Sequence, residues 1–100
     1  MIEITVAGGE IAVIGHANFA PAGKDIVCAG VSAITQSVLN WCIQHSDDAD
    51  AIRFNTNSGE FRMFFVPKKR IRREWEAVKE AALYGYSAVA AEYPQYVTVE

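Results

Sequence analysis

Long apolar runs, a basic leader and low-complexity segments are all missing from this sequence. No stretch approaches the ~18 uninterrupted apolar residues that a helix needs to span a bilayer. The first six residues carry acidic and polar side chains where a signal peptide would have a basic region and then an apolar one. We therefore expect a soluble, cytoplasmic protein that does not bind membranes.

Cysteine is scarce, with Cys28 and Cys42 as the two examples in 100 residues. They fall 14 positions apart in what the pattern predicts to be one helix, which separates them by about 20 Å. A disulfide cannot bridge that distance. Two unpaired thiols fit a reducing compartment, where a cysteine can stay free to act as a nucleophile.

The composition is that of one globular domain covering residues 1–100. Hydrophobic residues make up 51% of the chain and charged residues 21%, which excludes a disordered or fibrous protein. Nine basic and twelve acidic residues give a net charge of -3, so binding to polyanions over the whole surface is not favoured. Any basic patch must be local.

The hydrophobic pattern predicts seven elements in the order ββαββαβ. Alternating apolar residues and a Gly-Gly turn predict a hairpin, three-and-four spacing predicts each helix, and Pro94 ends the second helix. In the first helix we expect the repeating residues to face the core, and they are Val27, Val31, Ile34, Val38 and Trp41. The predicted ranges are a hairpin over 2–14, a loop over 17–24, a helix over 26–45, strands over 51–56 and 60–66, a helix between Pro67 and Pro94, and a strand over 96–99. We expect an α+β two-layer sandwich, a mainly antiparallel sheet with two helices on one face.

His16 and Cys28 form the candidate catalytic pair. Asp25 stands immediately before the first apolar helical run, which predicts that it caps the helix and that Cys28 lies in the first turn. The helix dipole and free amides there favour a thiolate, and the same amides could receive a developing oxyanion. An imidazole beside that thiol would serve as base and then as acid. On spacing alone the commoner interpretation stays open, in which Cys28 is a core residue and His16 lies on the surface.

Three residues near this pair each have two interpretations. Asp25 either only caps the helix or also orients His16, and local sequence favours the cap. Ser32 lies one turn after Cys28 and either hydrogen-bonds in the pocket or bonds the backbone of the preceding turn. Gly15 either allows a close approach of the chain near His16 or only ends a strand.

The residues around this pair resemble the signature of the ribosomal-processing cysteine protease Prp family. The matching stretch is Gly15-His16-Ala17, then Gly23, then Asp25 to Ala33, with His16 and Cys28 at the family's separation. The resemblance extends to the first hairpin and to the order of the later elements, which are less specific. Gly30 departs from the pattern because alanine is commoner there, at a small cost in helix propensity.

The resemblance implies a specific activity. Family members are bacterial endopeptidases that remove an N-terminal extension from large-subunit ribosomal protein twenty-seven, cutting after an aromatic residue and ahead of small and basic ones. It implies Cys28 as nucleophile, His16 as base and acid, a homodimer, and no cofactor. It also implies a mobile loop that governs substrate access, here made of Ala17, Asn18, Phe19, Ala20, Pro21, Ala22, Gly23 and Lys24.

Two other classes of function have some support in the sequence. A basic cluster at residues 68–73 would suit a non-catalytic module that binds RNA or the ribosome, although a solvated basic face is the commoner explanation and the net charge weakens the case for nucleic acid. Its members are Lys68, Lys69, Arg70, Arg72 and Arg73. Cys42 and His45 are three apart on a helix, but no second pair with ligand spacing accompanies them, so we expect no metal site. We expect Cys42 in the core and His45 at the helix C-terminus.

Overall fold

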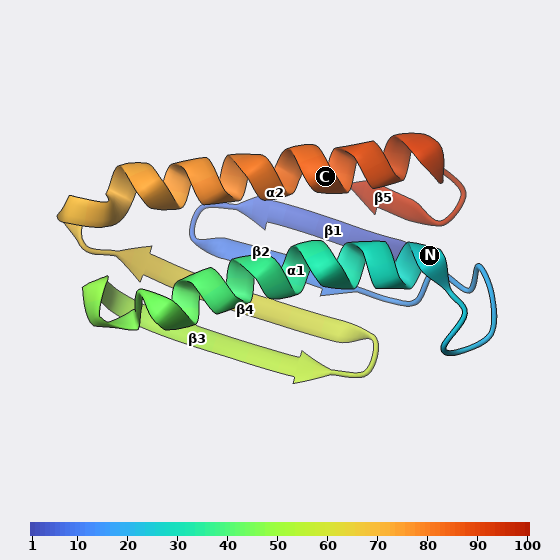
Figure 1. Ribbon diagram of the computed structural model, residues 1–100, viewed down its shortest axis with the longest axis horizontal. Helices are drawn as coiled ribbons and strands as arrows, with labels where there is room; N and C mark the ends of the chain where they lie inside the picture. The colour runs from blue at the N-terminus through green and yellow to red at the C-terminus, as the bar shows by residue number, and fades with distance from the viewer.

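The computed structural model describes residues 1–100, with two long helices side by side across one face of a five-stranded sheet (Figure 1). The strands are β1 (Ile2–Ala7), β2 (Glu10–Ile14), β3 (Ala49–Asn57), β4 (Glu60–Pro67) and β5 (Val97–Val99). The helices are α1 (Ile26–Gln44) and α2 (Arg72–Glu92), with short 3-10 turns η1 (Ser46–Asp48) and η2 (Lys69–Ile71). The predicted two-layer α+β sandwich and its element order are confirmed.

The order of strands across the sheet is β3-β4-β2-β1-β5. All pairs are antiparallel except β1 with β5, so the expectation of a mainly antiparallel sheet is also confirmed. The pairing of β2 with β4 sets Ile14 opposite Glu60. It therefore brings the chain that leaves β2 next to the β3–β4 turn, 40 residues and more further along the sequence.

The core lies between the helices and the sheet. The α1 side chains that face it differ slightly from the predicted set. Val27, Val31 and Val38 are buried as expected, but Ile34 and Trp41 are only half-buried. Thr35 takes a core position because its hydroxyl has two partners, the Val31 carbonyl at 2.8 Å and the Tyr86 hydroxyl at 2.7 Å. Periodicity of apolar residues alone passes over such a satisfied polar side chain.

Helix α1 has no charged side chain from its first residue to its last. By length and hydropathy alone it would suffice to cross a membrane. In this fold it is a core helix, with five buried side chains facing the sheet and α2. They are Val27, Val31, Thr35, Val38 and Cys42.

The boundaries of several elements differ from the predicted ones by one or two residues. Helix α1 ends at Gln44, and His45 is its C-cap, with its backbone amide directed at the carbonyls of the last turn. Strand β3 begins at Ala49 instead of 51, and the turns η1 and η2 were not predicted. Short 3-10 turns at helix ends depend on a few hydrogen bonds and leave no periodic signal.

Candidate active site

Cys28 lies in the first turn of α1, where the local sequence predicted it. Asp25 is the N-cap in extended backbone, and its Oδ1 accepts hydrogen bonds from the amides of Val27 at 3.0 Å and Cys28 at 2.9 Å. These bonds satisfy donors that the helix itself leaves free. The capping interpretation of Asp25 is confirmed.

The second carboxylate oxygen of Asp25 fixes the loop. Oδ2 accepts a hydrogen bond from the Phe19 amide at 3.0 Å. The Cys28 amide, and after it the amides of Phe19 and Ala20, hold the pKa of the Asp25 carboxyl below its ordinary value, against an opposing contribution from partial desolvation. No hydrogen bond joins Asp25 to His16, so this carboxylate orients the loop and the helix rather than the imidazole.

This cap occupies two of the amides at the helix start. The amides of Val27 and Cys28 donate to Asp25, and a developing oxyanion cannot receive the same two bonds. Instead, the sulfur of Cys28 is approached by an amide from the loop. The Ala17 nitrogen lies 3.4 Å from Sγ and donates to it, and Ala17 is itself buried.

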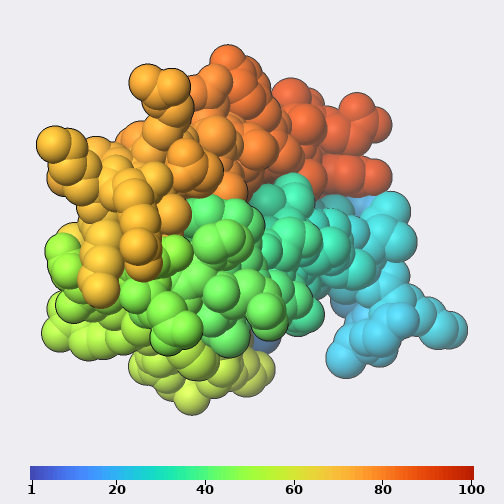
Figure 2. All heavy atoms as spheres, turned by 60° about the vertical axis from the view of Figure 1, so that its left-hand side comes forward, coloured from blue at the N-terminus to red at the C-terminus, as the bar shows by residue number.

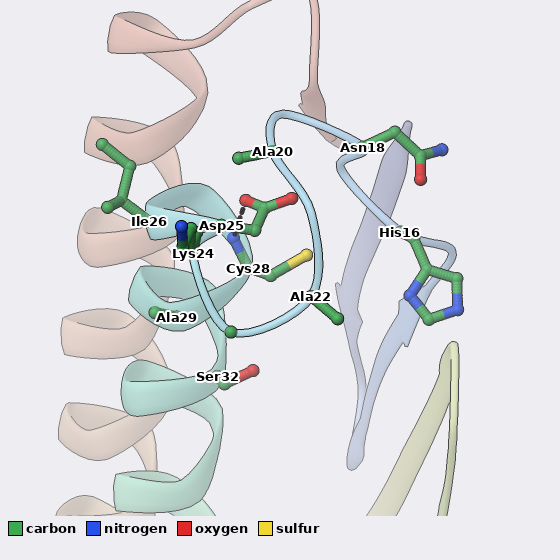
Figure 3. Close-up of a pocket in the computed structure, with 11 residues that line it drawn as sticks. His16, Asn18, Ala20, Ala22, Lys24, Asp25, Ile26, Cys28, Ala29 and Ser32 are labelled. Atoms are coloured by element: carbon green, nitrogen blue, oxygen red, sulfur yellow. Dashed lines mark hydrogen bonds between the residues drawn. The ribbon is translucent and has the colours of Figure 1, made fainter.

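His16 follows β2 and lies beside the β3–β4 turn. Its ring is so close to Gly59 that a Cβ added there would come within 2.7 Å of Nε2. Figure 3 shows the imidazole on the strand side of the site, with the Cys28 sulfur beneath the loop. No hydrogen bond joins the two side chains, so the structure brings them to one site without joining them.

Gly15 allows a close approach of the chain, which confirms the first of its two interpretations. Its φ of +103° lies in the left-handed region, and a side chain there would collide with the Met1 carbonyl. Its amide donates to the Gly59 carbonyl at 2.7 Å, while the carbonyl of His16 accepts from the terminal amine of Met1 at 2.6 Å. The backbone on either side of His16 is therefore fixed.

The predicted substrate loop over 17–24 is anchored at its beginning and exposed at its tip. Phe19 packs edge-on against Tyr93 and Tyr96, with ring centroids 5.5 and 5.2 Å apart. The tip closes with a hydrogen bond from the Lys24 amide to the Pro21 carbonyl at 3.0 Å. Figure 2 shows this loop, in light blue, standing out from the body of the molecule.

Two cavities meet at Cys28. The loop-side cavity, about 540 Å³, lies between the loop and the start of α1, and the sheet-side cavity, about 210 Å³, lies between α1 and the end of β2. Only His16, Cys28 and Ser32 line both. The hydroxyl of Ser32 makes no hydrogen bond within the chain, so it faces the cavities without a backbone partner.

Several residues beside the site have no local signal in the sequence. The segment Asn57-Ser58-Gly59 lies between two predicted strands and Tyr96 begins another, yet nothing in the sequence places either beside the loop or His16. The pairing of β2 with β4 brings the turn there, and the packing of Phe19 brings the tyrosines. A glycine at 59 was the one available signal, because its turn requires a positive φ, here +76°.

The other candidate residues lie away from this site. Cys42 is fully buried, which raises the pKa of its thiol to about 12 by desolvation, and its expected core position is confirmed. His45 caps the C-terminus of α1 and stacks on Trp41, with centroids 4.1 Å apart and Nδ1 within 2.7 Å of the Trp41 carbonyl. No group of three or more His, Cys, Asp or Glu side chains is arranged to hold a metal ion.

The basic cluster lies at the opposite end of the molecule from the loop (Figure 1). Arg70 forms an ion pair with Asp48, while Lys68, Lys69, Arg72 and Arg73 are exposed. Among the large aromatic residues of α2, Trp75 and Tyr86 are buried and Tyr84 is exposed.

Comparison with known proteins gives one consistent family. A sequence model described as cysteine protease Prp matches residues 1–98. The ribosomal processing cysteine protease Prp of Mycoplasma pneumoniae is 49% identical over 41 residues, which are 41% of this chain and 41% of that protein. The protein of the same name from Mycoplasma genitalium is 39% identical over 57 residues, 57% of this chain and 52% of that protein. The matched segments thus span about half or less of these relatives.

A solved structure extends the match over the whole fold. The ribosomal processing protease Prp from S. aureus, in complex with a covalently linked product peptide, superposes with a TM-score of 0.79 at 25% identity. The superposition covers 99% of this chain and 95% of that one. The chain belongs to the cysteine protease Prp family.

Proposed function

We propose that this chain is a cysteine endopeptidase in which Cys28 is the nucleophile and His16 is the general base and acid. The observation that carries the proposal is the position of Cys28. Its sulfur lies at the start of a helix, accepts a hydrogen bond from a backbone amide, and stands where two cavities meet. Family membership supports the same class of reaction.

The proposed reaction has two covalent steps. His16 takes the proton from the Cys28 thiol, Sγ attacks the scissile carbonyl carbon, and the C–N bond breaks as the imidazolium returns the proton to the departing amine. Water, deprotonated by His16, then hydrolyses the thioester and restores the free enzyme. Because the ring rests against Gly59, His16 must first rotate toward Cys28, and its exposed position leaves room for that movement.

The proposed substrate is the precursor of large-subunit ribosomal protein twenty-seven, cut after an aromatic residue at the end of its N-terminal extension. The relatives are named for ribosomal processing, and the S. aureus protein holds a product peptide, which supports a peptide substrate. A cavity on either side of Cys28 suits a chain that continues in both directions from the cut. Val13, Val31 and Phe61 give the sheet-side cavity apolar walls that suit a hydrophobic side chain.

The cellular setting completes the proposal. We propose that the protein is cytoplasmic, since two free thiols persist most readily in a reducing compartment. We also propose a homodimer, because the resemblance to the Prp family implies one. Light scattering in solution should then give the mass of two chains, and the mass of one chain would contradict the dimer.

The test is cleavage of a synthetic peptide in which an aromatic residue precedes a small residue and then basic ones. Wild type should produce two fragments, Cys28→Ala should produce none, and His16→Ala should be slower by roughly 10²-fold or more. Cys42→Ala is the matched control, because it removes the other thiol of the same helix without touching either cavity. Cleavage by Cys28→Ala above the rate in buffer would exclude the proposal.

A further inference from the structure

Two of the helix-start amides beside Cys28 already have an acceptor. The Val27 and Cys28 amides are taken by Asp25. The same carboxylate lies near the sulfur, since the Cys28 thiol contributes to the lowered pKa of Asp25. The donor that the structure places at the sulfur comes from another part of the chain.

The loop supplies such a donor at its beginning. The Ala17 N–H donates to Cys28 Sγ at 3.4 Å, and Ala17 is 2% exposed, so water does not compete freely for this amide. A hydrogen bond to a charged acceptor is stronger than one to a neutral acceptor, so the same N–H favours the thiolate over the thiol.

This donor is held in place from both sides. Upstream, the Gly15 amide bonds the Gly59 carbonyl and the His16 carbonyl bonds the Met1 amine. Downstream, the Phe19 amide bonds Asp25. The N–H of Ala17 therefore points at the sulfur without further ordering of the chain, which is the condition under which a donor contributes most.

We propose that the backbone amide of Ala17 is a catalytic group of this enzyme, the hydrogen-bond donor that stabilises the Cys28 thiolate. The inference rests on the proposed role of Cys28 as nucleophile. The ionisable side chains that line the loop-side cavity beside the sulfur are His16, Lys24 and Asp25.

The test replaces one atom of the backbone. Lactic acid in place of Ala17 turns the N–H into an ester oxygen while keeping the methyl group. The full chain can be assembled by ligating a synthetic segment 1–27 to a segment 28–100 that begins with Cys28. The matched control carries the same change at Ala7, at the end of β1 and outside both cavities. The measurement is the rate of Cys28 alkylation by iodoacetamide at pH 7, followed by intact mass.

The ester at 17 should slow alkylation of Cys28 by roughly tenfold or more relative to the all-amide protein. The ester at 7 should leave the rate within about twofold. An unchanged rate in a folded 17-ester protein would overturn the inference. Alkylation needs no peptide substrate, so the two proposals can fail separately. If the 17-ester protein is alkylated more slowly but the wild type cleaves no peptide, the proposed function is rejected and the role of the Ala17 amide stands.

A second measurement needs no altered backbone. In ¹⁵N-labelled wild type, the Ala17 amide proton should move downfield as pH rises and Cys28 loses its proton. In Cys28→Ala the same resonance should lose this response. A wild-type Ala17 resonance that does not follow Cys28 contradicts the inference, even if the ester protein fails to fold.

Discussion

The two ends of α1 carry the same residue types in different surroundings. At the N-terminal end, Cys28 is half-buried beside two cavities, with an Asp cap and a His nearby. At the C-terminal end, Cys42 is fully buried, and the neighbouring His45 is stacked on Trp41. A Cys and a His near one another therefore do not by themselves make a reactive site.

Two physical factors separate these ends. The first turn of a helix carries the positive end of the dipole, which favours an anion, while the last turn exposes carbonyls, which disfavour one. At the Cys28 end the amides of Val27 and Cys28 donate to Asp25, and the sulfur accepts its hydrogen bond from the Ala17 amide. Burial acts in the same direction, because desolvation raises the pKa of the Cys42 thiol to about 12. Cys42 is thus a core residue by position, and Cys28 is available for chemistry.

The largest expected difference between the two ends is in thiol reactivity. Brief treatment of folded wild type with iodoacetamide at pH 8 should modify Cys28 at least about 100-fold faster than Cys42, since the thiolate is the reacting form and Cys42 is both buried and protonated. Peptide mass mapping checks the ratio, and both thiols should react at similar rates in denaturant. Equal alkylation rates for Cys28 and Cys42 in the folded protein would contradict the proposed difference between the two ends.

Cys42→Ala should reduce the free energy of unfolding by about 1–2 kcal/mol at pH 7, because it leaves a small cavity in the core. The pKa of Cys42 is raised from an ordinary value of 9.0 to about 12, so the folded state holds this proton more tightly than the unfolded state. Its contribution is complete below pH 9 and is lost as pH rises toward 12. Urea unfolding at pH 7 and pH 10 should show the stability gap between wild type and variant narrowing at the higher pH.

Asp25→Ala should lower Tm by a few degrees at neutral pH, since it removes the cap at the Cys28 end of α1. The pKa of Asp25 is lowered from an ordinary value of 3.8, so the cap's contribution is present above that pH and is lost as pH falls through the lower folded-state value. Thermal unfolding from pH 7 to pH 2 measures the gap to wild type. Asp47→Ala, an exposed carboxylate beyond the other end of the helix, is the control and should leave Tm nearly unchanged. A Tm gap that persists to pH 2 would contradict this account.

Gly30→Ala should give the smallest change, a gain of about 0.5–1 kcal/mol in the free energy of unfolding, because glycine in a helix interior loses more conformational freedom than alanine. A Cβ at position 30 would meet nothing within 4 Å. At Gly85 of α2 a Cβ would come within 3.0 Å of Ile34 Cδ1, so Gly85→Ala should gain less or lose stability. Chemical denaturation measures the free energy of unfolding of both variants. A lower free energy of unfolding in Gly30→Ala than in wild type would contradict the prediction.

The local features of α1 were predictable because their signals lie within a few residues of one another. Asp25 precedes an apolar helical run, which set both the cap and the first-turn position of Cys28. The predicted set of core-facing residues in α1 was only partly right, because Thr35 is also buried, through a hydrogen bond with Tyr86, 51 positions away. A pattern of apolar residues holds no information about such a distant partner.

The amino-acid sequence was enough to predict the elements, their order and the helix cap. These follow from periodicity, turn residues and capping, which act between near neighbours in the chain. The tertiary structure was needed to show that His16 rests on Gly59, that Phe19 packs against Tyr93 and Tyr96, and that the Ala17 amide reaches the Cys28 sulfur. Those contacts depend on the order of the strands and on the packing of distant segments, where many weak interactions act together.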